Sequence, residues 1–293
     1  MPILFRRLQY NPIFKKQKNK LKIKFLLLLF VTVTMSVKAQ REAFKKGSVM
    51  VFWGWNRGWF SDSDIHFYGQ DYNFTLNNVS AHDRPTPLSN FSHYIDPTKI
   101  SIPQVNYNIT YFIKDNLGIT FGVDHMKYVM DQNQTVEFNG YINNPNYAAM
   151  VNNGKIDLSD GKFLKYEHTN GLNYLNLGIQ QYKQILNKKN FDIFLGYGLG
   201  TGVLVPKTDA TLMGKAESDH FHLAGFGLDA RTSVNMVIWN HIVAKAEFKY
   251  GYINLPSVRT TEENVNIDKA VQDFTFGELV FGVGYTFNTK KQK

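Results

Sequence analysis

Apolar and polar residues alternate with a period of two through most of the chain after about residue 49. In the segment 103–113, for example, Tyr107, Ile109 and Tyr111 alternate with Asn108 and Thr110. This alternation is typical of a β-strand with one apolar and one polar face. The pattern recurs along the chain and predicts eight strands, at 49–55, 103–113, 117–124, 174–180, 191–200, 224–231, 242–250 and 278–287.

The connections between these segments are alternately short and long. Short links lie around Lys114-Asp115-Asn116, at 186–189 and around Trp239-Asn240, and long links cover 57–101, 131–170, 205–220 and 254–272. Short periplasmic turns and long outer loops are expected of an outer-membrane barrel. The sequence therefore predicts an all-β fold, a closed antiparallel transmembrane β-barrel of about eight strands.

The first long link holds a further strand signal. Ile65, Phe67, Tyr72, Phe74 and Leu76 flank Gly69-Gln70-Asp71, which predicts a hairpin extending the barrel outward. Counting this hairpin, the barrel would have ten strands.

The N-terminal residues 1–39 have the features of a signal peptide. A basic stretch without acidic residues precedes the apolar run 25–31, and Val37-Lys38-Ala39 supplies the small residues of a cleavage site. Cleavage after Ala39 leaves 40–293 as the outer-membrane barrel.

Removing this segment changes the charge balance. The whole chain has 33 Lys and Arg against 24 Asp and Glu, but nine of the cations precede the cleavage site. The mature chain is therefore neutral, which removes the electrostatic argument for nucleic acid as a partner. Cysteine is absent, so disulfides and thiolate chemistry are excluded.

The predicted strands resemble the small outer-membrane barrels of the OmpA, OmpX and OmpW type. The last strand, Gly282-Val283-Gly284-Tyr285-Thr286-Phe287, is similar to the terminal assembly signal of such proteins. The segments Trp53–Arg57, Asp83-Arg84-Pro85, Ile102-Pro103-Gln104 and Asp124–Tyr128 also resemble an uncharacterised family of bacterial barrel proteins. The resemblance implies the fold and no particular activity.

An eight-stranded barrel has room only for its own side chains or one small ligand. Its predicted inward face carries charges of both signs: Asp124, Asp229, Arg231, Lys245, Glu247, Lys249 and Glu278. Buried charges are costly unless paired, so these residues form either a salt-bridged plug or a charged constriction that gates a solute. Glycines at 196–202 and 225–227 leave space that large side chains fill or an apolar ligand occupies.

The outer rim carries the remaining candidates, His125, Lys127, His220 and His222. Lys127 and His125 are placed to meet lipid phosphates, and His220 with His222 has the spacing of a metal pair or a general base. No catalytic residue, metal site or cofactor is assigned.

The leading interpretation is a non-enzymatic barrel with a side-chain-plugged lumen, acting in envelope integrity or surface interaction through its long loops. Outer-membrane lipid and lipopolysaccharide are the expected partners, with a surface protein or glycan as a further one. The alternatives are a lipid A-modifying acyl hydrolase or transferase, and binding or passage of a small apolar molecule.

Overall fold

The structure is a computed structural model that describes residues 43–90, 92–96, 104–262, 264 and 266–288. The chain separates into two units, Met1–Gln40 and Arg41–Lys293, and the described residues all belong to the second. The predicted signal peptide lies outside the described residues. None of the described helices is long and apolar enough to cross a membrane.

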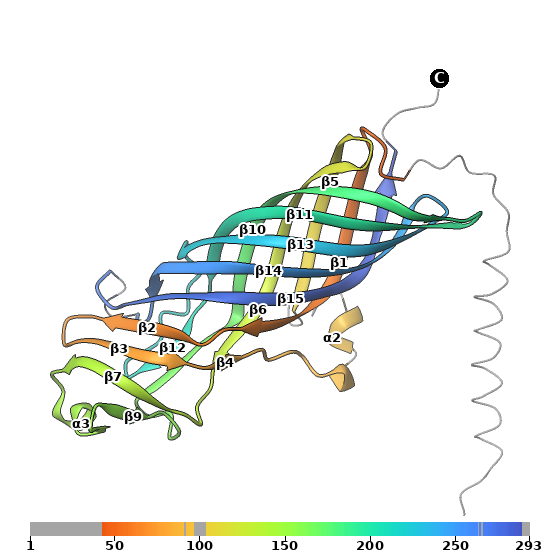
Figure 1. The fold of residues 1–293 in the computed structure, drawn as a ribbon. Helices are drawn as coiled ribbons and strands as arrows, with labels where there is room; N and C mark the ends of the chain where they lie inside the picture. The colour runs from red at the N-terminus through yellow and green to blue at the C-terminus, as the bar shows by residue number, and fades with distance from the viewer. Residues whose placement is uncertain (1–42, 91, 97–103, 263, 265, 289–293) are drawn as a thin grey trace, which may run out of the picture. The chain divides into compact units, whose positions relative to one another are not determined.

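Eight antiparallel strands form a ring (Figure 1). Each pairs with the next, and β1 pairs with both β5 and β15. All eight predicted strands are confirmed. In ring order they are β1 (Val49–Phe60), β5 (Val105–Lys114), β6 (Leu117–Met130), β10 (Leu164–Asn187), β11 (Phe191–Pro206), β13 (Gly225–Ile238), β14 (Ile242–Arg259) and β15 (Lys269–Phe287).

The register around the ring is staggered. Following paired residues from Val51 through β5 and the later strands leads to Thr275 on β15, whose carbonyl accepts a hydrogen bond from the amide of Ser61. The path therefore returns to the chain ten residues beyond its start. Such a stagger goes with strands that tilt relative to the ring axis.

The short turns lie together at the end of the ring where the described chain begins and ends. Trp239 and Asn240 both have positive φ, 50° and 64°, which suits the tight turn between β13 and β14. Asn116 adopts the same backbone region between β5 and β6.

The links predicted as long loops contain several strands, which corrects the sequence interpretation. Most ring strands continue past the predicted ends, and seven further strands join the same sheet: β2 (Ser63–Tyr68), β3 (Tyr72–Val79), β4 (Ala81–His82), β7 (Thr135–Ile142), β8 (Val151–Asn152), β9 (Lys155–Asp157) and β12 (Asp209–Leu212). The short helices of this end are η1 (Leu88–Asn90), α2 (Ser92–Ile95) and α3 (Pro145–Ala148).

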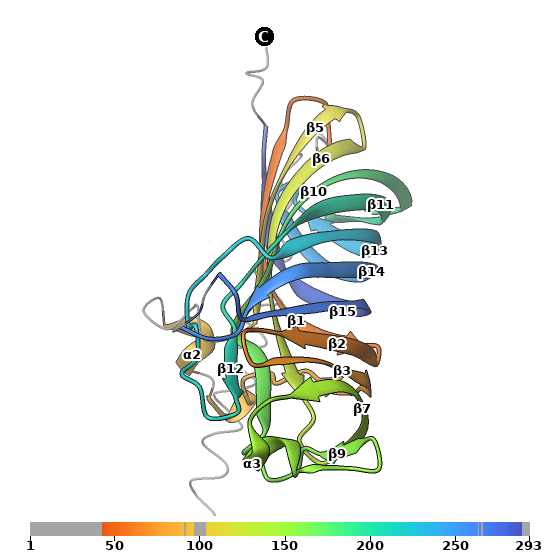
Figure 2. The same cartoon turned by 90° about the vertical axis from the view of Figure 1, so that its left-hand side faces the viewer.

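The predicted hairpin is confirmed as β2 and β3, but it does not widen the ring to ten strands. Among the ring strands, β2 pairs with the outer end of β15 alone, at Lys269–Gln272, and the sheet continues through β3, β7, β9 and β8 (Figure 2). The prediction of a ten-stranded barrel is therefore wrong, and the sheet has 15 strands of which eight form the ring.

The outward face of the ring is apolar and exposed. Its members alternate with buried inward residues, as the period-two pattern predicted. They include Tyr107, Ile109, Phe121, Leu177, Leu199, Leu228, Phe248, Val283 and Tyr285. In water this much exposed apolar surface would be unfavourable.

The interior has three layers. A cluster of apolar side chains lies at the short-turn end, charged and polar side chains fill the middle, and a large apolar core occupies the outer end. The outer core joins ring strands to β2, β3, β7 and β12, with rings such as Phe74 and Phe138 stacked at 5.0 Å between centroids.

Phe44 seals the short-turn end. This residue precedes β1 and is fully buried, with its ring centroid 4.7–4.9 Å from those of Phe112, Tyr182 and Phe194. Its carbonyl accepts a hydrogen bond from the amide of Asn116, which ties the N-terminal segment to the first turn. The sequence pattern did not single out Phe44 because it lies outside the alternating segments.

Replacing Phe44 by Ala should lower the free energy of unfolding by about 3–5 kcal/mol, because truncation leaves a cavity among three rings. The measurement is urea unfolding of the refolded protein, followed by the gel mobility of unheated samples. A matched control is Phe287→Ala on the exposed outward face, which should cost much less. Equal losses for the two variants would contradict the role of Phe44 as a seal.

Candidate functional site

The seven predicted lumen residues are all buried inside the ring, on four of its strands and at its middle level. They form three groups. Arg231 binds Asp229 through two nitrogens, both at 2.7 Å. The Nζ of Lys245 lies 3.0 Å from Oε2 of Glu247, and that of Lys249 lies between carboxylates of Asp124 and Glu278.

Neutral polar side chains connect these groups. The amide of Asn106 donates to both Asp124 and Glu278, and that of Asn176 donates to Asp124 while its oxygen accepts from Arg231. The Tyr174 hydroxyl donates to Asp229 at 2.9 Å. The two asparagines occupy inward positions of the alternating pattern, which is the signal that could have identified them.

This network fills the middle of the lumen. The glycines around it leave no open space there: a Cβ on Gly200 would lie 2.0 Å from Nη2 of Arg231, and one on Gly227 would lie 2.9 Å from the Tyr174 ring. Larger neighbours occupy the room that these glycines leave. Of the two sequence interpretations, the filled interior fits this arrangement.

Replacing Lys249 by Met should destabilise the protein by about 3–5 kcal/mol, because the carboxylates of Asp124 and Glu278 then share a buried space without a cation. Neutralising both acids in the same chain, as Lys249→Met with Asp124→Asn and Glu278→Gln, should restore most of the loss. Unfolding in urea measures both.

The exposed pair of Lys45 and Asp115 provides the control, because Lys45→Met should cost at most about 1 kcal/mol. A Lys249→Met variant as stable as the wild type would show that the central network contributes little.

The ring is irregular between the outer halves of β1 and β6. Among the described residues, the ladder between β1 and β5 ends at Trp55 and Val105. Asp83 bridges the gap: its carboxylate accepts hydrogen bonds from the amide of Gly58 and the side chain of Gln104. Burial raises the pKa of Asp83, while these two donors oppose that effect.

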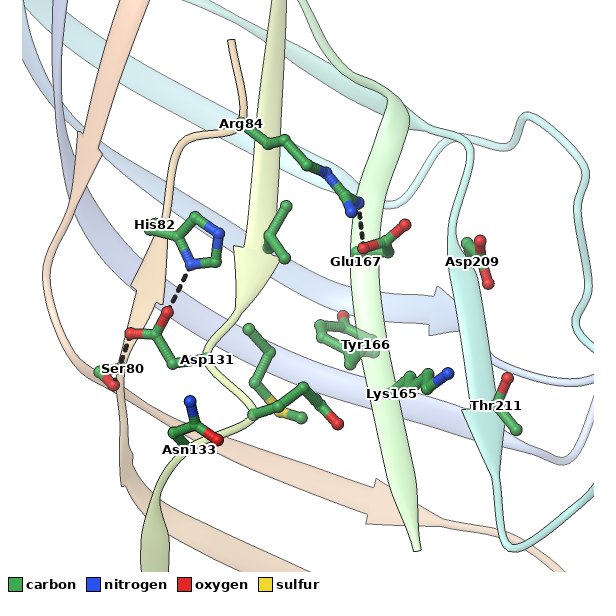
Figure 3. Close-up of a pocket in the computed structure, with 13 residues that line it drawn as sticks. Ser80, His82, Arg84, Asp131, Asn133, Lys165, Tyr166, Glu167, Asp209 and Thr211 are labelled. Atoms are coloured by element: carbon green, nitrogen blue, oxygen red, sulfur yellow. Dashed lines mark hydrogen bonds and ion pairs between the residues drawn. The ribbon is translucent and has the colours of Figure 1, made fainter. Parts of the chain in front are cut away.

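A polar groove of about 800 Å³ lies on the outward face next to this place (Figure 3). Four strands side by side, β4, β6, β10 and β12, carry it. The register places His82, Val129, Glu167 and Asp209 in one row across the sheet. A second row, two residues further along, holds Ser80, Asp131, Lys165 and Thr211.

Ion pairs within the groove balance most of its charge. Arg84 pairs with Glu167, and His82 pairs through Nδ1 with Asp131. The Ser80 hydroxyl donates to the same carboxylate at 2.9 Å (Figure 3). Asp131 thus lies between Ser80 and His82, whereas a nucleophilic triad requires the histidine to contact the serine.

The outer-rim candidates occupy two different places. His125 and Lys127 lie on the outward face of β6, and the Nδ1 of His125 is 2.8 Å from Oδ1 of Asn173. His222 has both ring nitrogens engaged: Nδ1 with the carbonyl of His220 at 3.3 Å, and Nε2 with the amide of Arg259 at 3.1 Å. The described residues contain no group of three potential metal ligands.

A carboxylate pair borders the groove on its β12 side. Glu217 lies beside Asp209, and their hydrogen bond, with burial and the negative charge of Asp209, raises the pKa of Glu217 to about 7. Glu217 is therefore protonated below about pH 7, and it then shares a hydrogen bond with Asp209.

This raised pKa predicts a pH dependence for the segment around 209–217. The folded state holds the proton more tightly than the unfolded chain, so stability from this pair falls as pH rises from about 4.5 to about 7. We expect amide exchange of the segment, corrected for intrinsic rates, to be faster at pH 8 than at pH 5.5. Glu217→Gln should abolish the difference, and an equal difference in that variant would contradict the assignment.

The chain resembles solved structures of outer membrane proteins at low sequence identity. No protein-family model and no curated protein matches the chain. Solved structures do match. The outer membrane protein OprG from Pseudomonas aeruginosa has 10% sequence identity and a TM-score of 0.39, and the match covers 85% of this chain and 100% of OprG. The outer membrane protein AlkL has 12% identity and a TM-score of 0.42, and the match covers 88% of this chain and 98% of AlkL. A third is Ail, the attachment invasion locus protein of Yersinia pestis, with 10% sequence identity and a TM-score of 0.31; the match covers 83% of this chain and 99% of Ail.

OprG and AlkL are described as outer membrane proteins, the class that the sequence pattern resembles. At these identities and scores the likeness concerns the general fold. The particular activity of each neighbour is not carried over to this chain.

Proposed function

We propose that the protein is a closed transmembrane β-barrel of the outer membrane that conducts no solute and acts through its outer end. It is a non-enzymatic barrel, in which the plugged ring anchors a folded platform at the cell surface. This platform consists of β2, β3, β7 and β12 with the outer ends of the ring strands. The platform contacts lipid, glycan or protein and contributes to the integrity of the envelope.

The filled lumen is the observation that carries this proposal. The Phe44 cluster, the central ion pairs and the outer apolar core follow one another along the interior. A solute crossing the ring would have to displace paired charges that are costly to separate. A stable plug therefore favours an anchoring role over transport.

The exposed apolar outward face supports placement in a membrane. In a ring each strand has two partners, so the backbone polar groups are satisfied without water. The outward apolar residues then contact lipid, and the polar groove lies beyond them on β6 and β10.

The rigid outer end supports a role in contact. Strands β2, β3 and β7 share the outer apolar core with the ring strands, so the hairpin cannot move independently of the barrel. Loops on a rigid scaffold commonly carry binding functions. Here the scaffold extends well beyond the apolar face.

Conductance measurements in planar bilayers test the proposed function. The refolded protein should show no conductance steps above the membrane baseline, while a general porin reconstituted in parallel conducts. The unheated protein should also migrate differently from the heated one on a denaturing gel, as a folded barrel does.

Reproducible conductance by the wild-type protein would overturn the plugged-barrel proposal. Identical migration of heated and unheated samples, with recovery in the soluble fraction, would overturn the membrane placement. Unchanged lipid A masses after deletion of the gene are expected for a non-enzymatic barrel.

A further inference from the structure

The groove lies above the apolar face of β6 and β10, and the register gives its height. Val123 pairs with Leu175 in the uppermost apolar row, and His125 pairs with Asn173 in the next. Asp131 lies six residues beyond His125, which corresponds to about 20 Å along an extended strand. With the usual tilt of barrel strands, the groove rises roughly 15 Å above the apolar boundary.

This height determines what the groove meets in a membrane. It opens sideways from the outward face of the sheet, because most of its lining residues alternate with residues of the buried core such as Tyr128 and Ala210. A molecule standing in the outer leaflet beside the barrel would present its headgroup to this face. Lipid chains would contact the apolar rows below.

Cations gather at the lower edge of the groove. Arg57 projects outward from β1 and, with Lys127, acts electrostatically on Asp83. Arg84 and Glu167 likewise act on Lys127. The lower edge therefore combines three cations with two carboxylates, and this excess of positive charge favours a phosphate.

The upper rows of the groove have a different chemistry. Arg84 and Lys165 face Asp131, Glu167 and Asp209, so the lining has little net charge when His82 is neutral or protonated. Among the residues that the structure describes, the Thr211 hydroxyl and the Asn133 amide have no hydrogen-bond partner within the chain. Donors and acceptors spaced along adjacent strands suit the hydroxyl groups of a sugar better than a second phosphate.

We propose that this groove binds the phosphorylated sugar headgroup of an outer-leaflet glycolipid of the lipopolysaccharide type. The phosphate lies against Arg57, Lys127 and Arg84, and the attached sugars lie along Lys165 and Thr211. The proposal rests on the membrane placement of the proposed function and names the lipid partner of the outer wall.

The test uses the mature protein refolded in detergent, with native mass spectrometry to count bound glycolipid at rising concentration. The probes are purified rough lipopolysaccharide, the same material after dephosphorylation, its lipid-free core oligosaccharide, and phosphatidylglycerol. Arg57→Gln with Lys127→Gln removes charge from the lower edge, and Lys165→Gln with Thr211→Ala changes the upper row. Lys155→Gln with Lys162→Gln removes two exposed charges outside the groove and serves as the matched control.

The lower-edge variant should bind rough lipopolysaccharide about tenfold more weakly, since each lost contact is a charge-assisted hydrogen bond. It should bind the dephosphorylated form as the wild type does. The upper-row variant should bind both forms more weakly, and the control variant should match the wild type. Weak or absent binding of the lipid-free oligosaccharide is expected, because the chains contribute through the apolar rows.

Three results would overturn the proposal. They are wild-type affinity in both groove variants, equal affinity of the wild type for phosphatidylglycerol, and tight binding of the oligosaccharide alone, which would indicate a soluble glycan ligand. The mobility shift of the unheated protein in glycolipid-free detergent is measured on the same samples. A normal shift with failed binding rejects the headgroup site alone, whereas an absent shift rejects the barrel itself.

Discussion

The pairing of β1 with β15 is the constraint on which the remaining structure depends. It joins the first ring strand in the sequence to the last over Val49–Phe60, so that these two strands have no free edge toward each other. In lipid an unpaired edge would expose backbone polar groups that have no water to bind. The stagger of this pairing goes with the strand tilt, and the strand number limits the width of the lumen.

A narrow lumen determines how its charges are arranged. Lys249 is paired in register with Glu278 on the neighbouring strand β15, and it also reaches Asp124 on β6 because the ring is small. Each carboxylate would be costly to bury alone, but together with asparagine donors the group is satisfied. The same network that fills the lumen also fixes the relative positions of opposite walls.

Beyond the ring, the strands do not end where the lipid-facing pattern ends. β6, β10 and β15 continue outward and acquire new partners in β4, β12 and β2, respectively. These additions bury a second apolar core on the inner side and leave polar side chains on the outer side. The groove on β4, β6, β10 and β12 therefore follows from the alternation of strands that continue past the exposed apolar face.

The sequence alone determined the ring strands, their inward and outward faces and the membership of the charged lumen, because all three depend on a local period of two. Tertiary structure decided the pairs within the lumen, since Asp124 and Lys249 are 125 residues apart. It also decided that the long links form strands, because these strands are short and gain their stability from pairing with the outer ends of ring strands. Phe44 and the groove belong to this second class: no periodic signal marks a plug outside the strands, or a row of side chains assembled from four separate segments.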